Sequence, residues 1–350
     1  MMARNNTMDF RLLDKESIPW ELMEGCYDHT IFKSKEWADF LEKTYKALPF
    51  VVEITERDAV IGYFYGQRIK KFGVTIVASP FEGWSTSYQG LTMLSQISIH
   101  KRIDIYEELI AWLFEYKHCL FFQAADWQLE VPECLHRDLT VKLVKGFALD
   151  LTQSEESLYK NMSSRAKDPI KKSQKRGVKI QKCSDINAYA DSYQLQLEDV
   201  FKQQGLSPTH TKGQTIKLLS ALKDKVLALY ATDESGENIA SSFYVYDGDY
   251  GFYAGAASFK EKQILCPNEP LMWEAIKELK KLGVKQLEFG GGRRYKEKYG
   301  PRSIVKPKII ATKYHWLITA RSIAKNSFYG MRRVFSMIKG QRIKTGKKIG

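Results

Sequence analysis

Apolar and polar residues alternate along this chain with a period of two in some segments and of three to four in others. The shorter period predicts strands and the longer one amphipathic helices. In the first part of the chain the predicted helices are residues 34–45 and 103–117. The predicted strands are residues 10–13, 49–55, 60–69, 71–78, 120–125 and 147–151, the second and third forming a hairpin. Because helices and strands alternate, this part is predicted to be α/β or α+β.

The pattern restarts at Thr152. Thr152 or Ser154 can cap a helix over residues 155–164. Pro169 is predicted to open the next helix at its first turn, and Gly177 to end it. The segments predicted after it are strand 178–181, helices 187–203 and 211–222, strands 226–232, 239–247 and 250–256, helix 271–282 and strand 284–289.

The length of the chain predicts two domains and an extension. A chain of 350 residues is long for one core, and 44% hydrophobic residues suffice for packed domains. We therefore expect a first domain over residues 1–150, a second over 151–312 and a tail over 313–350. Each domain should hold a mixed central sheet flanked by helices.

The positive charge is concentrated at the C-terminal end. The net charge is +13, yet residues 1–297 carry 40 Lys and Arg against 41 Asp and Glu, whereas residues 298–350 carry 14 Lys and Arg and no acidic residue. This argues against a globally basic nucleic-acid-binding protein and for a local contact with a membrane surface, RNA or an anionic ligand. Residues 315–339 have the period of a basic amphipathic helix, which either lies on an anionic membrane or packs on the second domain.

The five cysteines are scattered without CxxC spacing, which predicts reduced thiols in a cytosolic protein and no zinc site. The N-terminus lacks the apolar core of a signal peptide, and no stretch approaches about 18 uninterrupted apolar residues. We expect a cytoplasmic protein that binds no metal ion and does not span a bilayer.

Residues 287–300, LEFGGGRRYKEKYG, are the strongest candidate for a functional site. A short apolar strand runs directly into three glycines, which let a ligand approach the backbone closely. Cations for a phosphate or carboxylate and rings for stacking follow. A glycine-rich surface turn with solvated charges is the alternative interpretation. The residues concerned are Gly290, Gly291, Gly292, Arg293, Arg294, Tyr295, Lys296, Lys298 and Tyr299.

Residues 154–300 resemble the FemAB-like branch of the GNAT acyltransferase superfamily, including its BioF2-like acetyltransferase domain. Two helices, a three-stranded meander, a helix and a strand is the GNAT order of elements. The matching blocks, in the family's order, are the basic helix 164–177, Ile239-Ala240, residues 253–256, residues 268–273 and residues 283–300. The resemblance implies two GNAT-like domains in tandem, the first being the more divergent.

The resemblance also implies roles for single residues. Lys296 matches the lysine of the family's motif before Tyr-Gly, and would bind a phosphate or polarise the carbonyl under attack. Tyr253 matches an aromatic position that contacts the acceptor, although a strand tyrosine is also ordinary packing. Arg165, Lys171 and Lys172 would clamp phosphates of tRNA or of a lipid-linked substrate, or simply form a solvated helix face.

The first domain is expected to supply the general base, because the family often places an acidic group from that domain at the cleft. Glu82, in the sequence PFEGW, is the candidate, and Asp126 is the weaker alternative. A loop carboxylate that only confers solubility is the competing interpretation.

Members of the family transfer an aminoacyl group from aminoacyl-tRNA to a peptidoglycan precursor, and relatives are thought to N-acylate sugars in polysaccharide assembly. The resemblance therefore implies an N-acyltransferase acting on a nucleotide- or lipid-linked cell-envelope precursor, without a tightly bound cofactor. Residues 255–263 lack the Q/RxxGxG/A loop that holds acetyl-CoA, so aminoacyl-tRNA and acyl-CoA both stay open as donors. The alternatives are an acetyl-CoA-dependent sugar N-acetyltransferase and a non-catalytic tRNA- or RNA-binding protein of the same fold. A lipid-linked substrate would suit an enzyme peripheral to the inner face of the membrane.

Overall fold

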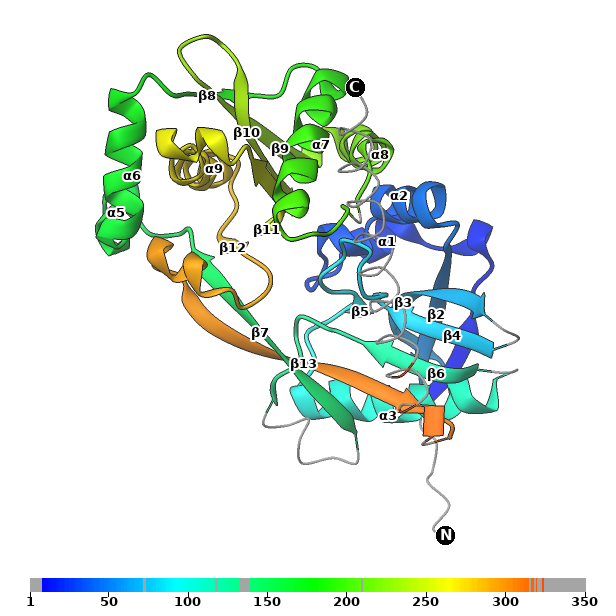
Figure 1. Cartoon of the computed structure of the whole chain (residues 1–350). Coiled ribbons are helices and arrows are strands. Elements are labelled where there is room, and N and C mark those ends of the chain that lie inside the picture. The colour runs from blue at the N-terminus through cyan, green and yellow to red at the C-terminus, as the bar shows by residue number, and fades with distance from the viewer. Residues whose placement is uncertain are drawn as a thin grey trace, which may run out of the picture.

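One mixed sheet of 13 strands runs through the described part of this computed structural model (Figure 1). The structure describes residues 8–71, 74–116, 119–131, 139–208 and 210–314, with residues 316, 317, 319 and 323. The order of the strands is β1-β2-β3-β4-β6-β13-β7-β12-β11-β10-β9-β8, and β5 pairs with β3.

The first half of the molecule has the element order expected of a GNAT-type domain. Its meander is β2, β3 and β4, each antiparallel to the next, and β6 returns parallel to β4 after the long helix α3. The elements are β1 (Met8–Leu12), η1 (Lys15–Ser17), α1 (Trp20–Glu24), η2 (Ile31–Lys33), α2 (Lys35–Tyr45), β2 (Leu48–Glu56), β3 (Ala59–Lys71), β4 (Val74–Ser79), β5 (Gly90–Met93), α3 (Ile99–Glu115) and β6 (Cys119–Ala124).

The second half repeats this order. Its meander is β9, β10 and β11, and β12 returns parallel to β11 after α9. The elements are β7 (Thr140–Asp150), α5 (Glu155–Asn161), α6 (Ser164–Lys175), β8 (Lys179–Lys182), α7 (Ile186–Gln203), α8 (Lys212–Leu222), η3 (Lys223–Lys225), β9 (Val226–Thr232), β10 (Asn238–Asp247), β11 (Tyr250–Ser258), η4 (Glu261–Leu265), α9 (Asn268–Lys281), β12 (Gln286–Glu288), η5 (Arg294–Tyr299) and β13 (Arg302–Thr312). The predicted mixed α/β fold with the GNAT order of elements in tandem is confirmed, but the two predicted sheets are joined into one.

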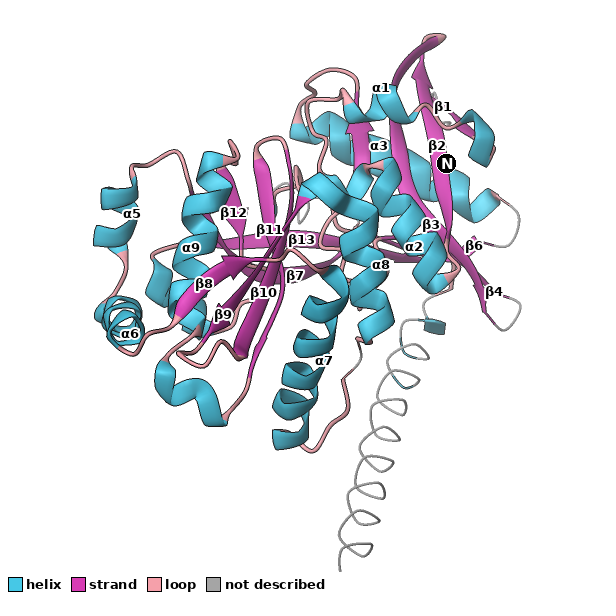
Figure 2. Cartoon of the chain, turned by 90° about the horizontal axis from the view of Figure 1, so that it is seen from above, coloured by secondary structure: helices cyan, strands magenta, loops and turns pink. Residues whose placement is uncertain are grey.

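Two long strands join the halves. β7 leaves the first half and pairs with β12, whereas β13 leaves the second half and pairs with β6. Between these contacts β7 and β13 pair with each other from Arg302↔Ala148 to Ile310↔Thr140. Figure 1 and Figure 2 both show this pair crossing from one half to the other. The domain boundary predicted after residue 150 therefore falls at the end of β7. Both strands that pair with β7, namely β12 and β13, come later in the chain.

An apolar core also joins the halves. α2 packs on α8, and the rings of Phe32 and Phe252 lie 4.6 Å apart. The amine of Lys217 donates to the carbonyl of Lys43 across the same interface. The fully buried Trp37 and Leu218 belong to this core. A shared apolar core of this kind holds the halves in a fixed orientation.

The predicted start of one helix was wrong, and some elements were not predicted. α6 begins at Ser164, so Pro169 lies inside the helix rather than at its first turn. Ala166 and Ile170 bury one face of α6, and this packing outweighs the loss of the one backbone hydrogen bond that proline cannot donate. The helix α1 and the strands β5 and β13 were not predicted.

The predicted basic helix of the tail lies almost entirely outside the described residues. Among the helices that the structure does describe, none is long and apolar enough to cross a bilayer.

Candidate active site

The candidate site begins where β11 and β12 separate. The two strands pair in parallel only over three positions, from Tyr250↔Gln286 to Phe252↔Glu288. β11 continues to Ser258, while the chain after Glu288 turns away at Gly290, whose φ of +62° favours glycine. The glycine segment, residues 290–292, lines the larger of two cavities, whereas η5, which follows it, lines the smaller one.

The smaller cavity, of about 380 Å³, lies in the second half between β10, β11, the start of α9 and η5. Four tyrosines line it together with Met272: Tyr253, Tyr295 and Tyr299 of the predicted site, and Tyr244. Lys298 and Glu269 form an ion pair on the lining.

The larger cavity, of about 660 Å³, lies between the halves. The loop after β4 lines one side, including Glu82 and Tyr88, and residues 290–293 line another. Most of its charged side chains are cationic, so the cavity favours an anionic ligand. These cations are Lys142, Lys145, Arg293, Lys306 and Lys308.

Glu288 is the titratable group of this larger cavity that the sequence analysis missed. Its side chain is buried, with 3% exposed, and its Oε1 accepts a hydrogen bond of 3.0 Å from the hydroxyl of Tyr88. Oε2 has no hydrogen-bond partner among the described residues. Burial raises the pKa of Glu288 to about 8, although Tyr88, Lys306 and Lys296 act in the opposite direction. A carboxylate with such a pKa can accept a proton from an amine near neutral pH.

A signal for Glu288 was present in the sequence. Glu288 stands between Leu287 and Phe289, both fully buried in the core of the second half. Since side chains on a strand alternate, Glu288 must face the other way, toward the first half. A carboxylate at the last position of a buried strand is rare without a partner or a function.

Lys296 lies on the opposite side of the glycine segment. Its ammonium donates to three successive backbone carbonyls, those of Phe289 (2.5 Å), Gly290 (2.9 Å) and Gly291 (3.1 Å). It also lies 5.6 Å from the ring of Tyr253. Burial and nearby Arg293 lower the pKa of Lys296 to about 8. All three N–H groups of the Lys296 ammonium are therefore bonded to backbone carbonyls.

This contact fixes the direction of three amides. In a trans peptide the N–H points away from the C=O of the same unit. Since three carbonyls converge on Lys296, the amides of Gly290, Gly291 and Gly292 point away from it. Within the described part of the chain these amides have no hydrogen-bond partner. The three glycines also line the larger cavity. Such an array of amides can stabilise a developing oxyanion.

Replacing Lys296 with methionine is expected to lower the transfer rate by about 100-fold, because amides that lose their orientation no longer stabilise the oxyanion. The loss of charged hydrogen bonds should also cost about 1.5–3 kcal/mol of unfolding free energy. Steady-state kinetics and urea unfolding measure the two effects. Lys285→Met removes an exposed ion pair with Asp249 and serves as the control. A Lys296→Met variant with the wild-type rate would contradict this role.

Glu82, the predicted general base, lies at the larger cavity. Its Oε1 accepts a hydrogen bond of 2.8 Å from Lys308, and its side chain is 32% exposed. The loop that carries it is held by Trp84, which stacks on Tyr45 at 4.7 Å and contacts Phe81 at 4.5 Å. Glu82 thus reaches the cavity as predicted, but as one partner of an ion pair.

The structure does not bring the cations of α6 to either cavity. Arg165, Lys171 and Lys172 are exposed, and none lines the cavities described above. Figure 1 and Figure 2 show α6 at the end of the second half that lies away from the first half. Arg294 is also exposed and lines neither cavity.

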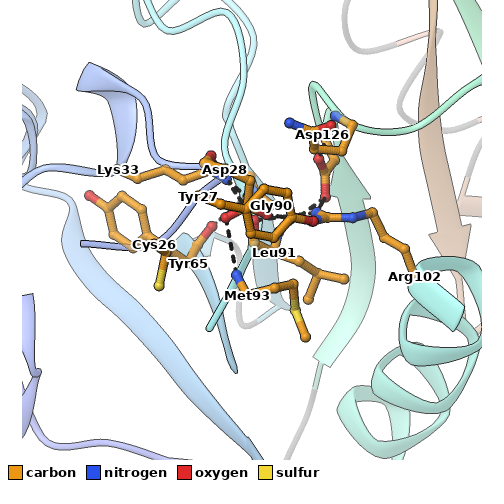
Figure 3. Close-up of polar contacts among 12 residues, drawn as sticks. Cys26, Tyr27, Asp28, Lys33, Tyr65, Gly90, Leu91, Met93, Arg102 and Asp126 are labelled. Carbon is orange, nitrogen blue, oxygen red and sulfur yellow. Dashed lines mark hydrogen bonds and ion pairs between the residues drawn. The ribbon is translucent and has the colours of Figure 1, made fainter. Parts of the chain in front are cut away.

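Asp126, the weaker candidate for the base, belongs to a buried charge network in the first half (Figure 3). Its Oδ2 accepts hydrogen bonds from Arg102 (2.6 Å) and from the hydroxyl of Tyr106 (2.8 Å). Arg102 also pairs with Asp28, and Lys33 donates to the carbonyls of Asp28 and Leu91. Asp126 is fully buried and is absent from the lining of the larger cavity.

The comparisons with known proteins agree with this fold. No protein-family model matches the sequence, and no curated protein matches it either. Among solved structures, FemX superposes with a TM-score of 0.69 at 9% identity, over 89% of this chain and 99% of FemX. A conserved protein of unknown function from Bacteroides thetaiotaomicron superposes with a TM-score of 0.56 at 8% identity, over 87% of this chain and all of that protein. The FemAB-like resemblance is thus confirmed in the fold.

Proposed function

We propose that this protein, which has the fold of FemX, is an acyltransferase that moves an acyl or aminoacyl group onto an amine. The observation that carries the proposal is Glu288, a buried carboxylate with a pKa of about 8 beside the amides of the glycine segment. A proton acceptor next to oriented donors is what acyl transfer to an amine requires.

The acceptor amine enters the larger cavity, and Glu288 takes a proton from its nitrogen. The nitrogen attacks the carbonyl carbon of the donor, whose reactive end lies against the glycine segment in the larger cavity. The oxyanion accepts hydrogen bonds from the amides of Gly290, Gly291 and Gly292. The new C–N bond remains when the C–O or C–S bond of the donor breaks. The proton held by Glu288 then passes to the leaving oxygen or sulfur.

The start of α9 favours an aminoacyl ester over a CoA thioester as the donor. The N-terminus of a helix attracts phosphate only where amides and positive charge are available. Here Pro267 occupies the N-cap position and Glu269 places a carboxylate in the first turn. That carboxylate is already paired with Lys298. An aminoacyl-tRNA carries its aminoacyl group on a ribose ester and needs no pyrophosphate site here.

The cations of the larger cavity favour an acceptor with a negative charge. A nucleotide- or lipid-linked precursor of the cell envelope, with a peptide or sugar amine, has that charge. Lys142, Lys145 and Arg293 are the cations that would meet it. Contact with such a lipid-linked acceptor would bring the protein to the inner face of the membrane.

Donor binding is expected to raise the melting temperature. Aminoacyl-tRNA at 100 times its Kd would add about 2.7 kcal/mol, a shift of a few degrees, whereas acetyl-CoA would give no shift. Differential scanning fluorimetry with both donors and with deacylated tRNA measures this. Mass spectrometry of amine acceptors incubated with the stabilising donor then detects the transferred group. Stabilisation by tRNA with no transfer to any amine would favour the non-catalytic RNA-binding alternative.

A further inference from the structure

A second polar cavity, of about 600 Å³, adjoins the larger one, with which it shares Lys306. The segment after β6 lines it with Trp127 and Gln128, and the starts of β11 and β12 contribute Tyr250 and Gln286. β13 adds Arg302, Ile304 and Lys306. The proposed reaction uses none of these residues as a proton acceptor or oxyanion donor.

Lys306 lines both cavities. Its ammonium lies 4.8 Å from the centre of the Trp127 ring, and its side chain is half-buried. Among the residues that the structure describes, no carboxylate lies within ion-pair distance of this ammonium, and no hydrogen bond satisfies it. Burial lowers the pKa of Lys306 as well. A cation held in this way, without a counter-ion, suits the binding of an anion.

Arg302 provides a second cation at the other end of the cavity. Residues 302, 304 and 306 share one face of β13, so the two cations stand roughly 13 Å apart along the strand, with Ile304 between them. The guanidinium of Arg302 donates to the side-chain oxygen of Gln286 at 3.0 Å and is otherwise exposed. Glu130 is the one carboxylate among the described lining residues.

We propose that this second cavity binds a phosphate or carboxylate group between Lys306 and Arg302. A guanidinium with open donors, an ammonium over an indole ring and the amides of Gln128 and Gln286 provide charge and hydrogen bonds for such a group. The group belongs either to the far end of the acceptor or to a separate small anion. In either case the anionic group would contact Lys306 and Arg302.

The cavity is also connected to the proposed base by direct contacts. The ring of Trp127 lies 4.9 Å from that of Tyr88, and the hydroxyl of Tyr88 donates to Glu288. A ligand on Lys306 would lie close to Trp127, whose ring packs on Tyr88, the residue that bonds to Glu288. An acceptor that spans both cavities would have its amine at Glu288 and its anion at Lys306.

Isothermal titration of the full chain with pyrophosphate tests the site without turnover. Arg302→Gln and Lys306→Gln are each expected to weaken binding by at least about tenfold, the effect of losing one charged contact. Lys172→Gln, which removes an exposed cation that lines neither cavity, should leave the affinity within about twofold. Equal weakening by all three variants, unchanged affinity in Arg302→Gln and Lys306→Gln, or an absence of binding would overturn the proposal.

Transfer to glucosamine and to glucosamine 6-phosphate distinguishes the two sources. If the anion is part of the acceptor, the phosphorylated sugar should have the lower KM, and Arg302→Gln should abolish the preference. If the anion is separate, the two sugars should behave alike while pyrophosphate still binds. The binding result does not depend on the proposed reaction, so either can fail without the other.

Discussion

Replacing Glu288 with glutamine is expected to lower the rate of acyl transfer by about 100- to 10,000-fold, the usual contribution of a positioned general base. Glutamine keeps the size of the side chain and can still hydrogen bond to Tyr88, so the cavity should be preserved. The single change removes only the ability to accept a proton. Initial rates at saturating donor measure the effect.

The pH dependence of the transfer rate provides a further test of this role of Glu288. The rate should rise with pH as Glu288 ionises, with its pKa of about 8, and fall as Lys296, also with a pKa of about 8, loses the proton that holds the carbonyls. The optimum should therefore lie near pH 8, and Glu288→Gln should lose the rising limb. Tyr88→Phe removes a hydrogen bond that favours the carboxylate and should move the rising limb to higher pH.

The free energy of unfolding shows whether a loss of activity in Glu288→Gln comes from a loss of stability. The pKa of Glu288 is raised in the folded state, so its contribution to stability is full below its ordinary pKa of 4.5 and is lost as the pH rises through about 8. Above that pH, Glu288→Gln should be at least as stable as the wild type although it is inactive. Glu82→Gln is the matched comparison at the same cavity. A full loss of rate in Glu82→Gln with an active Glu288→Gln would assign the base to Glu82 instead.

Replacing Arg102 with methionine is expected to destabilise the protein by about 3–5 kcal/mol, because the change leaves buried carboxylates without their counter-ion. Arg102 is 1% exposed and bonds to Asp28 and Asp126, which are 2% and 0% exposed. Methionine fills most of the volume, so the loss is electrostatic rather than a cavity effect. Urea unfolding followed by circular dichroism gives the free energy.

The neighbouring residue on α3 provides a matched control. Lys101 pairs with Glu56 at the surface, where both side chains are 30% exposed, so Lys101→Met should cost under about 1 kcal/mol. Equal costs for the two variants would contradict the proposed importance of the buried network.

The same network predicts a loss of stability in acid. Burial acts to raise the pKa of Asp126, but Arg102 and Lys33 outweigh it and hold that pKa below 3.8. Its contribution to stability is thus present above the ordinary pKa of aspartate and is lost as the pH falls through the lower, folded-state value. The unfolding free energy of Asp126→Asn should therefore fall less in acid than that of the wild type.

The regular elements of the second half were predictable because their signals are local. The meander β9, β10 and β11 follows from alternation and from the turns at Gly236 and Gly248, both of which have positive φ. α7 and α8 follow from helical spacing and from caps at Asp185 and Thr211. Each of these depends on neighbours within a few residues along the chain.

Features that depend on distant partners could not be predicted. β13 contains Lys306, Pro307 and Lys308, a sequence typical of a loop. It forms a strand because it pairs with β6 and β7. The partners of Arg102 lie 24 and 74 residues away. The role of Lys296 was predicted as direct contact with substrate, whereas its bonds to three carbonyls depend on the turn of the glycine segment. Sequence motifs located the site but not the direction of its side chains.

The crossing of β7 and β13 means that no single break in the chain yields two complete sheets. A fragment that ends at residue 150 would hold β6 and β7 without the strand that lies between them. The complementary fragment would keep β12 and β13 but lose their common neighbour. The tandem repeat visible in the order of elements is therefore not a pair of separable modules. Each copy pairs with a strand from the other half of the chain, so exchanging one copy alone would break the sheet of the other.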